Sequence, residues 1–328
     1  MNMKKDMVGP IPHKSHSLQD GNGVTISVVV PSFNSKRTIR ETLGTILGQK
    51  TKHAFEVIVV DSSNDGTGEI IAKEFLTVRL FRLERQTYPG SGRNLGVMRA
   101  TGKYVAFTDS DCVPDPDWLE RIVTNFEQHE TDAVGGCVIN GYPQSPTAWV
   151  SHLIEFNEWT EGMPEGFVKN IPTCSIAYRR QIFFERDLSF TDIFPSEDTI
   201  FNWTLIEKGG KIYFDPKIRV LHLSRVGFTK LFRHQFTLGQ ASAEARRTTT
   251  LPGRIFVRFP ILSLMLPFVR WARTFWRLFK HDTAKCLIFV TLAPLYLPAV
   301  FAWSFGFMSK REFKPAVIKI EPVTMPAK

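Results

Sequence analysis

Short, almost unbroken apolar runs recur through the first third of the chain, and segments with helical spacing separate them. The runs cover residues 24–30, 55–60, 78–83 and 104–108, and helices are expected over 35–48, 68–75 and 94–100. Apolar runs without polar alternation are typical of strands that are buried on both faces of a parallel sheet. Strands that alternate with helices therefore predict a doubly wound α/β sheet.

Polar residues stand where these predicted strands end. Ser32, Asp61 and Asp109 each follow one of the apolar runs. In open α/β sheets, ligands bind in the crevice beyond the carboxyl ends of the strands. We therefore expect these three side chains to converge on one site.

The fourth run leads directly into Asp109-Ser110-Asp111. Two carboxylates so close together repel each other, and a hard divalent cation relieves that repulsion. The preceding segment, Gly90 to Asn94, is rich in glycine and carries Arg93. Together they indicate a site for a metal ion that carries a polyphosphate. The alternative is a strand that ends in a polar turn, because Asp and Ser favour turns.

Composition limits the classes of protein that fit. Hydrophobic residues make up 43% of the 328 residues, and the net charge is +9. This content is that of a globular protein, and the charge indicates an anionic partner. The four cysteines are scattered without a Cys-x-x-Cys pair, so neither a structural zinc site nor a disulfide framework is expected. Residues 1–23 are polar, lack a signal-peptide core and are expected to be disordered.

The second half of the chain has a less regular pattern. Strands are expected over 133–139, 174–178, 211–214 and 218–222, and helices over 118–129, 180–185 and 199–208. Glu197 and Asp198 come directly before the last of these helices. Asp is a favoured N-cap residue, so capping is one role for Asp198 and catalysis is another.

The C-terminal part has a different character. Residues 254–280 mix apolar residues with arginines and tryptophans, as in a basic amphipathic helix at a membrane surface. Residues 286–308 follow without a charge over 23 positions, which is long enough to span a bilayer. Pro294 and Pro298 also permit a kinked or re-entrant segment, and a buried core hairpin is a further alternative. Basic residues flank this stretch on both sides, so its orientation stays open.

Several motifs in a fixed order resemble glycosyltransferase family 2. The resemblance covers residues 24–239. It rests on Val28-Val29-Val30-Pro31-Ser32-Phe33-Asn34, Val59-Val60-Asp61, Asp65-Gly66-Thr67, Gly92-Arg93-Asn94-Leu95-Gly96, Gly102-Lys103-Tyr104, Asp109-Ser110-Asp111, Pro116-Asp117-Trp118-Leu119-Glu120 and Glu197-Asp198.

The resemblance implies a GT-A fold, a Rossmann-like mixed sheet flanked by helices. The glycosyltransferase domain would cover residues 24–240. Membrane-associated amphipathic and hydrophobic helices would cover 251–308, with a tail over 309–328.

The resemblance also implies roles for individual residues. Asp198 would be the general base, with Glu197 helping to orient the acceptor. Asp111 would bind Mn²⁺ or Mg²⁺, and His222 is either a second metal ligand or a structural histidine. The donor site would consist of Pro31, Ser32, Asn34, Asp61, Arg93, Asp109 and Ser110.

The implied reaction is inverting, metal-assisted transfer of a single sugar from a nucleotide-sugar donor, UDP-linked by expectation. The acceptor would be lipid-linked or a polysaccharide, at the cytoplasmic face of the cell membrane. Processive synthases of the family carry Gln-x-x-Arg-Trp, which Phe232-Arg233-His234-Gln235-Phe236 does not match. A nucleic-acid partner is not expected, because the arginines gather beside the apolar C-terminal segment.

Three other classes are alternatives. A dinucleotide-dependent oxidoreductase needs Gly-x-Gly-x-x-Gly after its first strand, where this chain has Pro31-Ser32-Phe33-Asn34. A sugar-phosphate nucleotidyltransferase of related fold would open with a glycine-rich basic loop, which is missing at that position. A catalytically degenerate membrane-bound binding protein is the third alternative.

Overall fold

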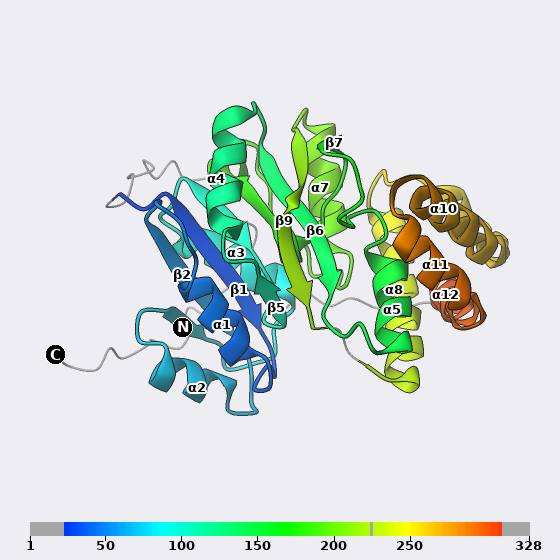
Figure 1. Cartoon of the computed structure of the whole chain (residues 1–328), viewed down its shortest axis with the longest axis horizontal. Coiled ribbons are helices and arrows are strands. Elements are labelled where there is room, and N and C mark those ends of the chain that lie inside the picture. Colours follow the sequence, from blue (N-terminus) through cyan, green and yellow to red (C-terminus); the bar gives the residue numbers. More distant parts are fainter. Residues whose placement is uncertain (1–22, 224–225, 310–328) are drawn as a thin grey trace, which may run out of the picture.

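A nine-stranded mixed sheet forms the centre of the molecule, and helices cover both of its faces (Figure 1). The computed structural model describes residues 23–223 and 226–309. The strand order is β3-β2-β1-β4-β8-β6-β9-β5, with β7 paired to β9. The predicted GT-A type of mixed α/β sheet is therefore the observed architecture.

The first four strands are parallel, as the apolar runs predict. They are β1 (Ile26–Ser32), β2 (Phe55–Asp61), β3 (Arg79–Arg82) and β4 (Tyr104–Phe107), joined by the helices α1 (Ile39–Leu47), α2 (Thr67–Glu74) and α3 (Pro89–Arg99). Val28 and Val30 pack in one core cluster with α1, whereas Val29 packs in another with α3. The strands are thus buried on both faces, which is why their sequences lack polar alternation.

The remaining strands complete the sheet in mixed directions. They are β5 (Cys112–Pro114), β6 (Ala133–Asn140), β7 (Gly166–Val168), β8 (Ile176–Arg179) and β9 (Ile212–His222). Strand β8 lies antiparallel between β4 and β6, and β6 runs parallel to β9. The helices here are α4 (Trp118–Gln128), α5 (Pro146–Glu155), η1 (Thr173–Ser175), α6 (Ile182–Glu185) and α7 (Glu197–Glu207).

The glycine-rich segment from Gly90 to Asn94 is helical, so the helix expected over 94–100 is longer at its N-terminal end. Helix α3 begins at Pro89 rather than at Asn94. A Cβ atom at Gly90 would lie 2.0 Å from the Thr191 carbonyl oxygen, and one at Gly96 would lie 2.2 Å from Val29 Cγ1. These glycines therefore let α3 pack closely on the sheet and on a later loop.

Two other boundaries in the second half differ from the expectation. The strands expected over 211–214 and 218–222 are one strand, β9, whose pairing with β6 shifts register between Gly136 and Cys137. The Lys217 N–H donates to Asp215 Oδ1 over 2.8 Å within that irregularity. The strand expected from Cys174 begins at Ile176, because Thr173–Ser175 form a 3₁₀ turn.

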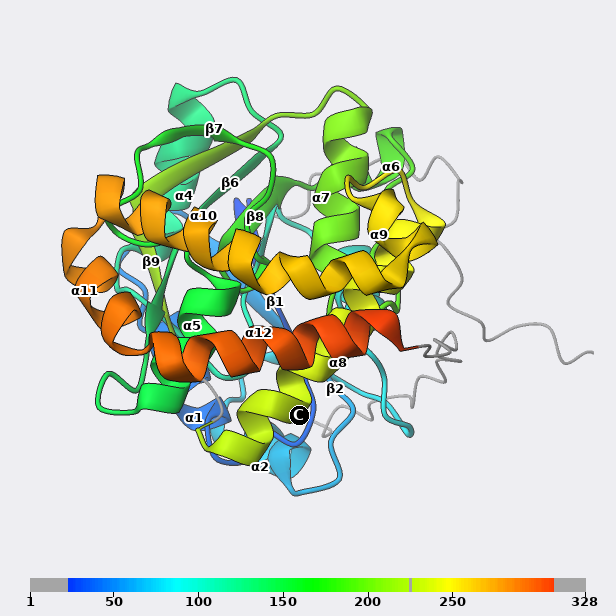
Figure 2. The same ribbon diagram turned by 90° about the vertical axis from the view of Figure 1, so that its right-hand side faces the viewer.

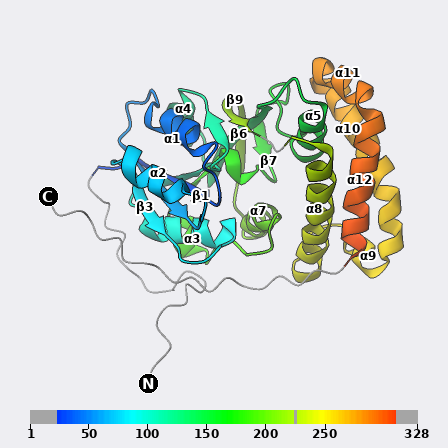
Figure 3. The same ribbon diagram turned by 90° about the horizontal axis from the view of Figure 1, so that it is seen from below.

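The C-terminal helices form a layer beside the sheet domain (Figures 2 and 3). They are α8 (Phe228–Thr248), α9 (Arg254–Arg258), η2 (Pro260–Met265), α10 (Leu266–His281), α11 (Thr283–Thr291) and α12 (Ala293–Met308). Helices α8 and α12 are in close backbone contact. A Cβ at Gly239 would lie 1.9 Å from the Trp303 carbonyl oxygen, and one at Gly306 would lie 1.9 Å from that of Phe236.

This layer corrects the expected C-terminal organisation. The single basic helix expected over 254–280 is divided into α9, η2 and α10. Within the described residues, no single helix is long and apolar enough to cross a membrane. By length and composition alone, the pair α11 and α12 could do so, and it is bent by 80°. The expected domain boundary at residue 240 falls inside the continuous helix α8. The expected tails over 1–23 and 309–328 lie outside the described residues, apart from Gly23 and Ser309.

Candidate active site

A cleft of about 1440 Å³ opens at the carboxyl ends of the parallel strands and continues to the C-terminal helices. Register places Ser32 of β1 directly beside Asp61 of β2. Nearly all of the predicted site residues line this cleft: Pro31, Ser32, Asn34, Arg93, Asp109, Ser110, Asp111, Glu197, Asp198 and His222. The expected convergence of strand ends is therefore observed for this set.

Asp61 is the predicted residue that does not line the cleft, which corrects its expected direct contact with the donor. Its side chain is 1% exposed, and burial raises its pKa. Ser63 Oγ donates to Asp61 Oδ1 over 2.5 Å and in turn accepts from the Asn34 N–H over 2.7 Å. Asp61 Oδ2 has no hydrogen-bond partner among the described residues. Asp61 thus supports the loop that carries Asn34 from beneath.

Hydrogen bonds from neighbouring loops hold Asn34 and Ser110 in place. The Asn64 N–H donates to Asn34 Oδ1 over 3.1 Å, and Asn34 has a left-handed φ of 53°. The hydroxyls of Ser110 and Ser35 are 2.5 Å apart, and Thr38 Oγ1 donates to the Ser110 carbonyl oxygen over 2.8 Å. The loop between the two aspartates is therefore fixed to the segment that follows β1.

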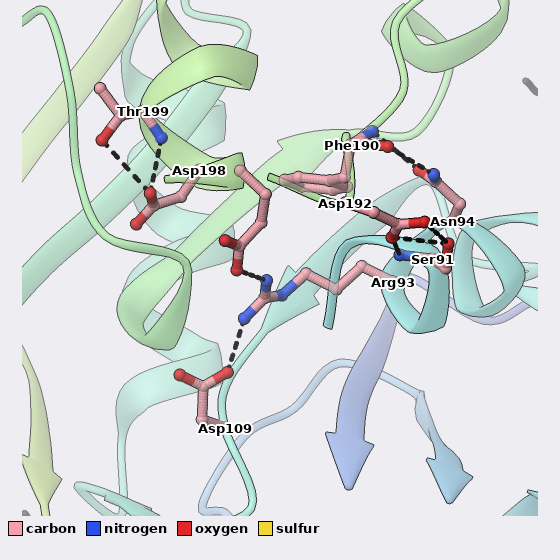
Figure 4. A network of polar contacts seen from close by, with 9 residues as sticks. Ser91, Arg93, Asn94, Asp109, Phe190, Asp192, Asp198 and Thr199 are labelled. Atoms are coloured by element: carbon pink, nitrogen blue, oxygen red, sulfur yellow. Dashed lines mark hydrogen bonds and ion pairs between the residues drawn. The ribbon is translucent and has the colours of Figure 1, made fainter. Parts of the chain in front are cut away.

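Arg93 joins two parts of the site that are far apart in the sequence (Figure 4). Its Nη1 donates to Glu197 Oε1 and its Nη2 to Asp109 Oδ1, each over 2.7 Å. The Arg93 side chain is 2% exposed. A guanidinium bound in this way is not available to a diphosphate, so the expected nucleotide contact of Arg93 gives way to a positioning role.

Burial and charge act in opposite directions on this triad. Burial raises the pKa of Glu197 to about 7, and the positive charge of Arg93 opposes that rise. Asp109 and Glu197 in turn raise the pKa of Arg93, which outweighs the effect of burial. The ionised state of Glu197 thus depends on Arg93. Glu197 lines the cleft but is only 4% exposed, and its role in orienting the acceptor stays a prediction.

A second set of contacts ties α3 to the loop before α7 (Figure 4). Ser91 Oγ donates to Asp192 Oδ1 over 2.7 Å. Asn94 Nδ2 donates to the Phe190 carbonyl oxygen over 2.8 Å, and the Phe190 N–H donates back to Asn94 Oδ1 over 2.9 Å. Sequence reasoning missed Ser91 and Asp192, because their partners lie about a hundred residues away along the chain.

Asp198 is the second residue of α7, so the N-cap alternative is wrong. The N-cap position is Ser196, and it makes no side-chain cap hydrogen bond. Asp198 Oδ1 accepts from the Thr199 N–H over 2.6 Å, and the carboxyl group reaches the cleft. Burial raises the pKa of Asp198 above the ordinary aspartate value. A carboxylate whose pKa is raised is a better proton acceptor near neutral pH.

Asp111 and His222 could hold a divalent cation. Cys112 pairs with His222 between β5 and β9, and this register brings His222 Nε2 to 3.8 Å from Asp111 Oδ1. Ligand atoms of Asp111, Cys112 and His222 lie within 4.8 Å of one another, as do those of Asp109, Cys112 and Cys174. Burial raises the pKa of the Cys112 thiol, which keeps it protonated. The carboxylate oxygen and the imidazole nitrogen are therefore the better donors in this group.

Comparisons with known proteins identify the family. Residues 27–187 match the family model described as "Glycosyl transferase family 2". Just under half of the chain is thus similar to family 2 glycosyltransferases. The chain is a glycosyltransferase (EC 2.4). The oxidoreductase, nucleotidyltransferase and degenerate binding-protein alternatives are thereby set aside.

Similar proteins come from archaea and bacteria. "Glycosyltransferase AglE" of Haloferax volcanii is 29% identical over 232 residues, which is 67% of this chain and 73% of that protein. The "dolichyl N-acetyl-alpha-D-glucosaminyl phosphate 3-beta-D-2,3-diacetamido-2,3-dideoxy-beta-D-glucuronosyltransferase" of Methanococcus voltae is 25% identical over 66% of this chain and 72% of that protein. "Poly(ribitol-phosphate) beta-N-acetylglucosaminyltransferase TarS" of Staphylococcus aureus is 34% identical over 36% of this chain and 22% of that protein.

Solved structures share the fold. The mannosyltransferase PcManGT from Pyrobaculum calidifontis, in complex with GDP-Man and Mn²⁺, aligns with a TM-score of 0.55 at 19% identity and covers 88% of each chain. A crystal structure of S. aureus TarS in complex with UDP-GlcNAc aligns with a TM-score of 0.51 at 20% identity. It covers 87% of this chain and 90% of that one.

Replacing Arg93 tests its structural role. Arg93→Met leaves two carboxylates without their shared cation, so we expect the free energy of unfolding to fall by about 3–5 kcal/mol. Arg99→Met is the matched control on the exposed side of the same helix, and we expect it to stay within about 0.5 kcal/mol of the unaltered chain. Urea unfolding followed by circular dichroism measures both. Equal losses in the two variants would contradict the role of Arg93.

Proposed function

We propose that this enzyme is an inverting glycosyltransferase that adds a single sugar to a lipid-linked or polysaccharide acceptor at a membrane surface. The observation that carries the proposal is the position of Asp198. It reaches the same cleft as Asp111 and His222, and the Arg93 triad fixes the start of its helix relative to Asp109. A cleft that holds both a base for the attacking hydroxyl and a site for the leaving phosphate fits a reaction in which the hydroxyl displaces the nucleotide in one step.

Asp198 would act as the general base. Inversion in one step requires a proton acceptor near the attacking hydroxyl, on the face of the sugar opposite the leaving group. The raised pKa of Asp198 favours proton acceptance, and its hydrogen bonds to Thr199 orient the carboxylate. General-base catalysis of this kind contributes roughly 10²–10⁴-fold to the rate.

Asp111 and His222 would hold Mn²⁺ or Mg²⁺ beside the donor diphosphate. Such a cation, when bound, neutralises charge on the leaving phosphate oxygen as a Lewis acid. The chain supplies the carboxylate from the loop between β4 and β5, which Thr38 holds at Ser110, and the imidazole from the end of β9. The PcManGT structure, which shares the fold and contains Mn²⁺ with GDP-Man, supports the same class of cofactor.

The donor is proposed to be UDP-linked, with Pro31, Ser32, Asn34 and Ser110 at its nucleoside side. Supporting this, the TarS structure that shares the fold was solved with UDP-GlcNAc. The relatives also differ in acceptor: one name specifies a dolichyl phosphate sugar and another poly(ribitol-phosphate). Both kinds of acceptor carry phosphate.

The exposed side of the C-terminal layer fits a membrane surface. Large apolar side chains on α9, η2, α10 and α11 are about half exposed or more: Ile255, Phe259, Ile261, Met265, Phe268, Val269, Trp276, Phe279 and Leu287. Arg254, Arg258 and Lys280 are exposed among them. Apolar side chains mixed with basic ones favour the interface of an anionic bilayer, which we place at the cytoplasmic face of the cell membrane.

Asp198→Asn tests the base. We expect transfer of radiolabelled sugar from UDP-sugars into membrane lipid and polymer fractions to fall by about 10²–10⁴-fold, because the amide cannot accept the proton. The affinity for UDP should stay unchanged. Glu207→Gln at the far end of α7 is the control and should retain activity. An Asp198→Asn enzyme with full activity would rule out the base.

Asp111→Asn tests the metal site. In calorimetric titrations, we expect Mn²⁺ to tighten UDP binding by the unaltered enzyme, and expect the variant to lose that gain by at least about tenfold. Asp115→Asn, whose carboxylate pairs with Arg219 at the surface, should behave as the unaltered enzyme. Mn²⁺-dependent UDP binding that survives in Asp111→Asn would contradict this assignment.

A double variant, Trp276→Ser with Phe279→Ser, tests the membrane surface. Their side chains are 65% and 55% exposed, and each contributes about 1.5–3 kcal/mol when buried in lipid. We therefore expect co-sedimentation with phosphatidylglycerol vesicles to be lost. Leu76→Ser is the control, since Leu76 is 85% exposed and follows α2 by two residues. Helix α2 lies on the far side of the molecule from α10 (Figure 3). Equal sedimentation of all three proteins would contradict the proposal.

A further inference from the structure

Two arginines stand over neighbouring aromatic rings on the wall of the cleft that α8, α10 and α12 form. The Arg270 guanidinium carbon lies 4.8 Å from the centre of the Trp303 ring, and that of Arg246 lies 6.0 Å from the centre of the Phe307 ring. The two rings belong to successive turns of α12, and their centres are 5.2 Å apart. All four side chains line the cleft.

Neither guanidinium has a carboxylate partner within the part of the chain that the structure describes. Arg246 donates to the carbonyl oxygens of Pro252 and Ser242 and to Ser242 Oγ, over 2.8, 2.9 and 2.5 Å. Arg270 Nη2 donates to the Ile154 carbonyl oxygen over 3.2 Å. Carbonyl and hydroxyl oxygens fix the geometry of these groups without neutralising their charge.

Neighbouring arginines, in contrast, form ion pairs with carboxylates. Arg273 and Arg277 both pair with Glu158, and Arg247 pairs with Glu244. Glu155, at the end of α5, pairs with His234 and accepts a hydrogen bond from Gln235. The charges of Glu155 and Glu158 act on Arg270 from a distance, and no ion pair among the described residues neutralises Arg246 or Arg270.

Two like charges that are partly removed from water favour an anion between them. Burial, and then repulsion by Arg270, lowers the pKa of Arg246 to about 10. Burial also lowers the pKa of Arg270. A phosphoryl group relieves this cost well, because its oxygens accept paired hydrogen bonds from planar guanidinium groups.

The position of the pair separates it from the proposed donor site. Asp111 and His222 stand at the ends of sheet strands, whereas Arg246 and Arg270 belong to the C-terminal helices. Ala245, next to Arg246, packs in one cluster with Ile200, which lies two residues after Asp198 on α7. Arg246 thus stands next to a residue that packs on the helix of the proposed base.

We propose that Arg246 and Arg270 bind a phosphoryl group of the acceptor and hold its sugar or hydroxyl end toward Asp198. That the bound molecule is the acceptor rests on the proposed function; the anion site rests on the two arginines alone. The phosphoryl group belongs either to a lipid phosphate or to a phosphate-containing polymer, and the same side chains would bind it in both cases.

Direct binding tests the site without any transfer reaction. Farnesyl phosphate, farnesol and ribitol 5-phosphate are titrated against the full chain in detergent with EDTA, after the donor site has been saturated with UDP. We expect farnesyl phosphate to bind at least about tenfold more tightly than farnesol, because charge-assisted hydrogen bonds are lost without the phosphate. This comparison requires no variant, so it stands even where a substitution impairs folding.

Variants then locate the site. Arg246→Gln and Arg270→Gln should each weaken farnesyl phosphate binding by at least about tenfold. Arg247→Gln, adjacent on α8, and Lys73→Gln, exposed in the last turn of α2, should not change it. Unchanged UDP binding shows that each variant is folded. Arginine-dependent binding of ribitol 5-phosphate at equal affinity points to a polymer source, and tighter farnesyl phosphate binding points to a lipid source.

Other results would overturn the proposal. Farnesol that binds as tightly as farnesyl phosphate would show an apolar site, and equal phosphate binding by all four variants would show an anion site elsewhere. Loss of transfer in Asp198→Asn with intact phosphate binding leaves this inference standing. Conversely, phosphate binding that does not depend on the arginines removes it without affecting the base.

Discussion

The Arg93 guanidinium, enclosed with two carboxylates, is the interaction on which the geometry of the site depends. It lies on α3, and its partners lie on the loop after β4 and at the start of α7. Desolvation of Arg93 and Glu197 is costly, and the close pairing of opposite charges offsets it. Arg93 therefore holds both carboxylates. This arrangement places Asp109 and Asp198, the residue after Glu197, on one cleft.

The surrounding packing gives the triad little freedom to move. Gly90 and Gly96 bring α3 against a later loop and against β1, and Ser91 and Asn94 hold that loop by hydrogen bonds. The glycine-rich segment from Gly90 to Asn94 thus connects the sheet to this loop rigidly. A rigid support of this kind keeps catalytic groups within the narrow tolerance that transfer reactions need.

The C-terminal layer extends the site rather than only anchoring it. The α8–α12 contact, with glycine on each helix, sets the wall that carries Arg246, Arg270 and the two aromatic rings. The opposite side of the layer presents apolar and basic side chains outward. One layer thus joins the cleft that contains the proposed base to the surface that we propose for lipid contact.

Sequence could predict the parts of the fold and site that depend on local patterns. The apolar runs predict β1 to β4, because burial on both faces leaves no polar alternation, and their polar exits predict the cleft. The pairing of Arg93 with Glu197 could not be predicted, because 104 positions separate them and either residue alone is compatible with the surface. Helix α3 starts earlier than expected because close packing overrides the low helix propensity of glycine.

The C-terminal helices show the same limit. An uncharged stretch of 23 residues is compatible with a straight span, yet it folds as two helices bent by 80° against α8 and α10. The composition shows that the segment is apolar, but it does not predict which other helices pack against it. The burial of Asp61 beneath the Asn34 loop is a similar case, since the residue stands at the predicted strand end but faces the interior.

A double-mutant cycle on Asp109 and Glu197 tests most directly whether Arg93 couples the two sides of the site. The free energy of urea unfolding is measured for Asp109→Asn, Glu197→Gln, both together and the unaltered enzyme. Residues that share a charged partner should give a non-additive term of about 0.5–3 kcal/mol. Additive losses, within roughly 0.5 kcal/mol, would show that the two carboxylates act independently and that the triad does not organise the site.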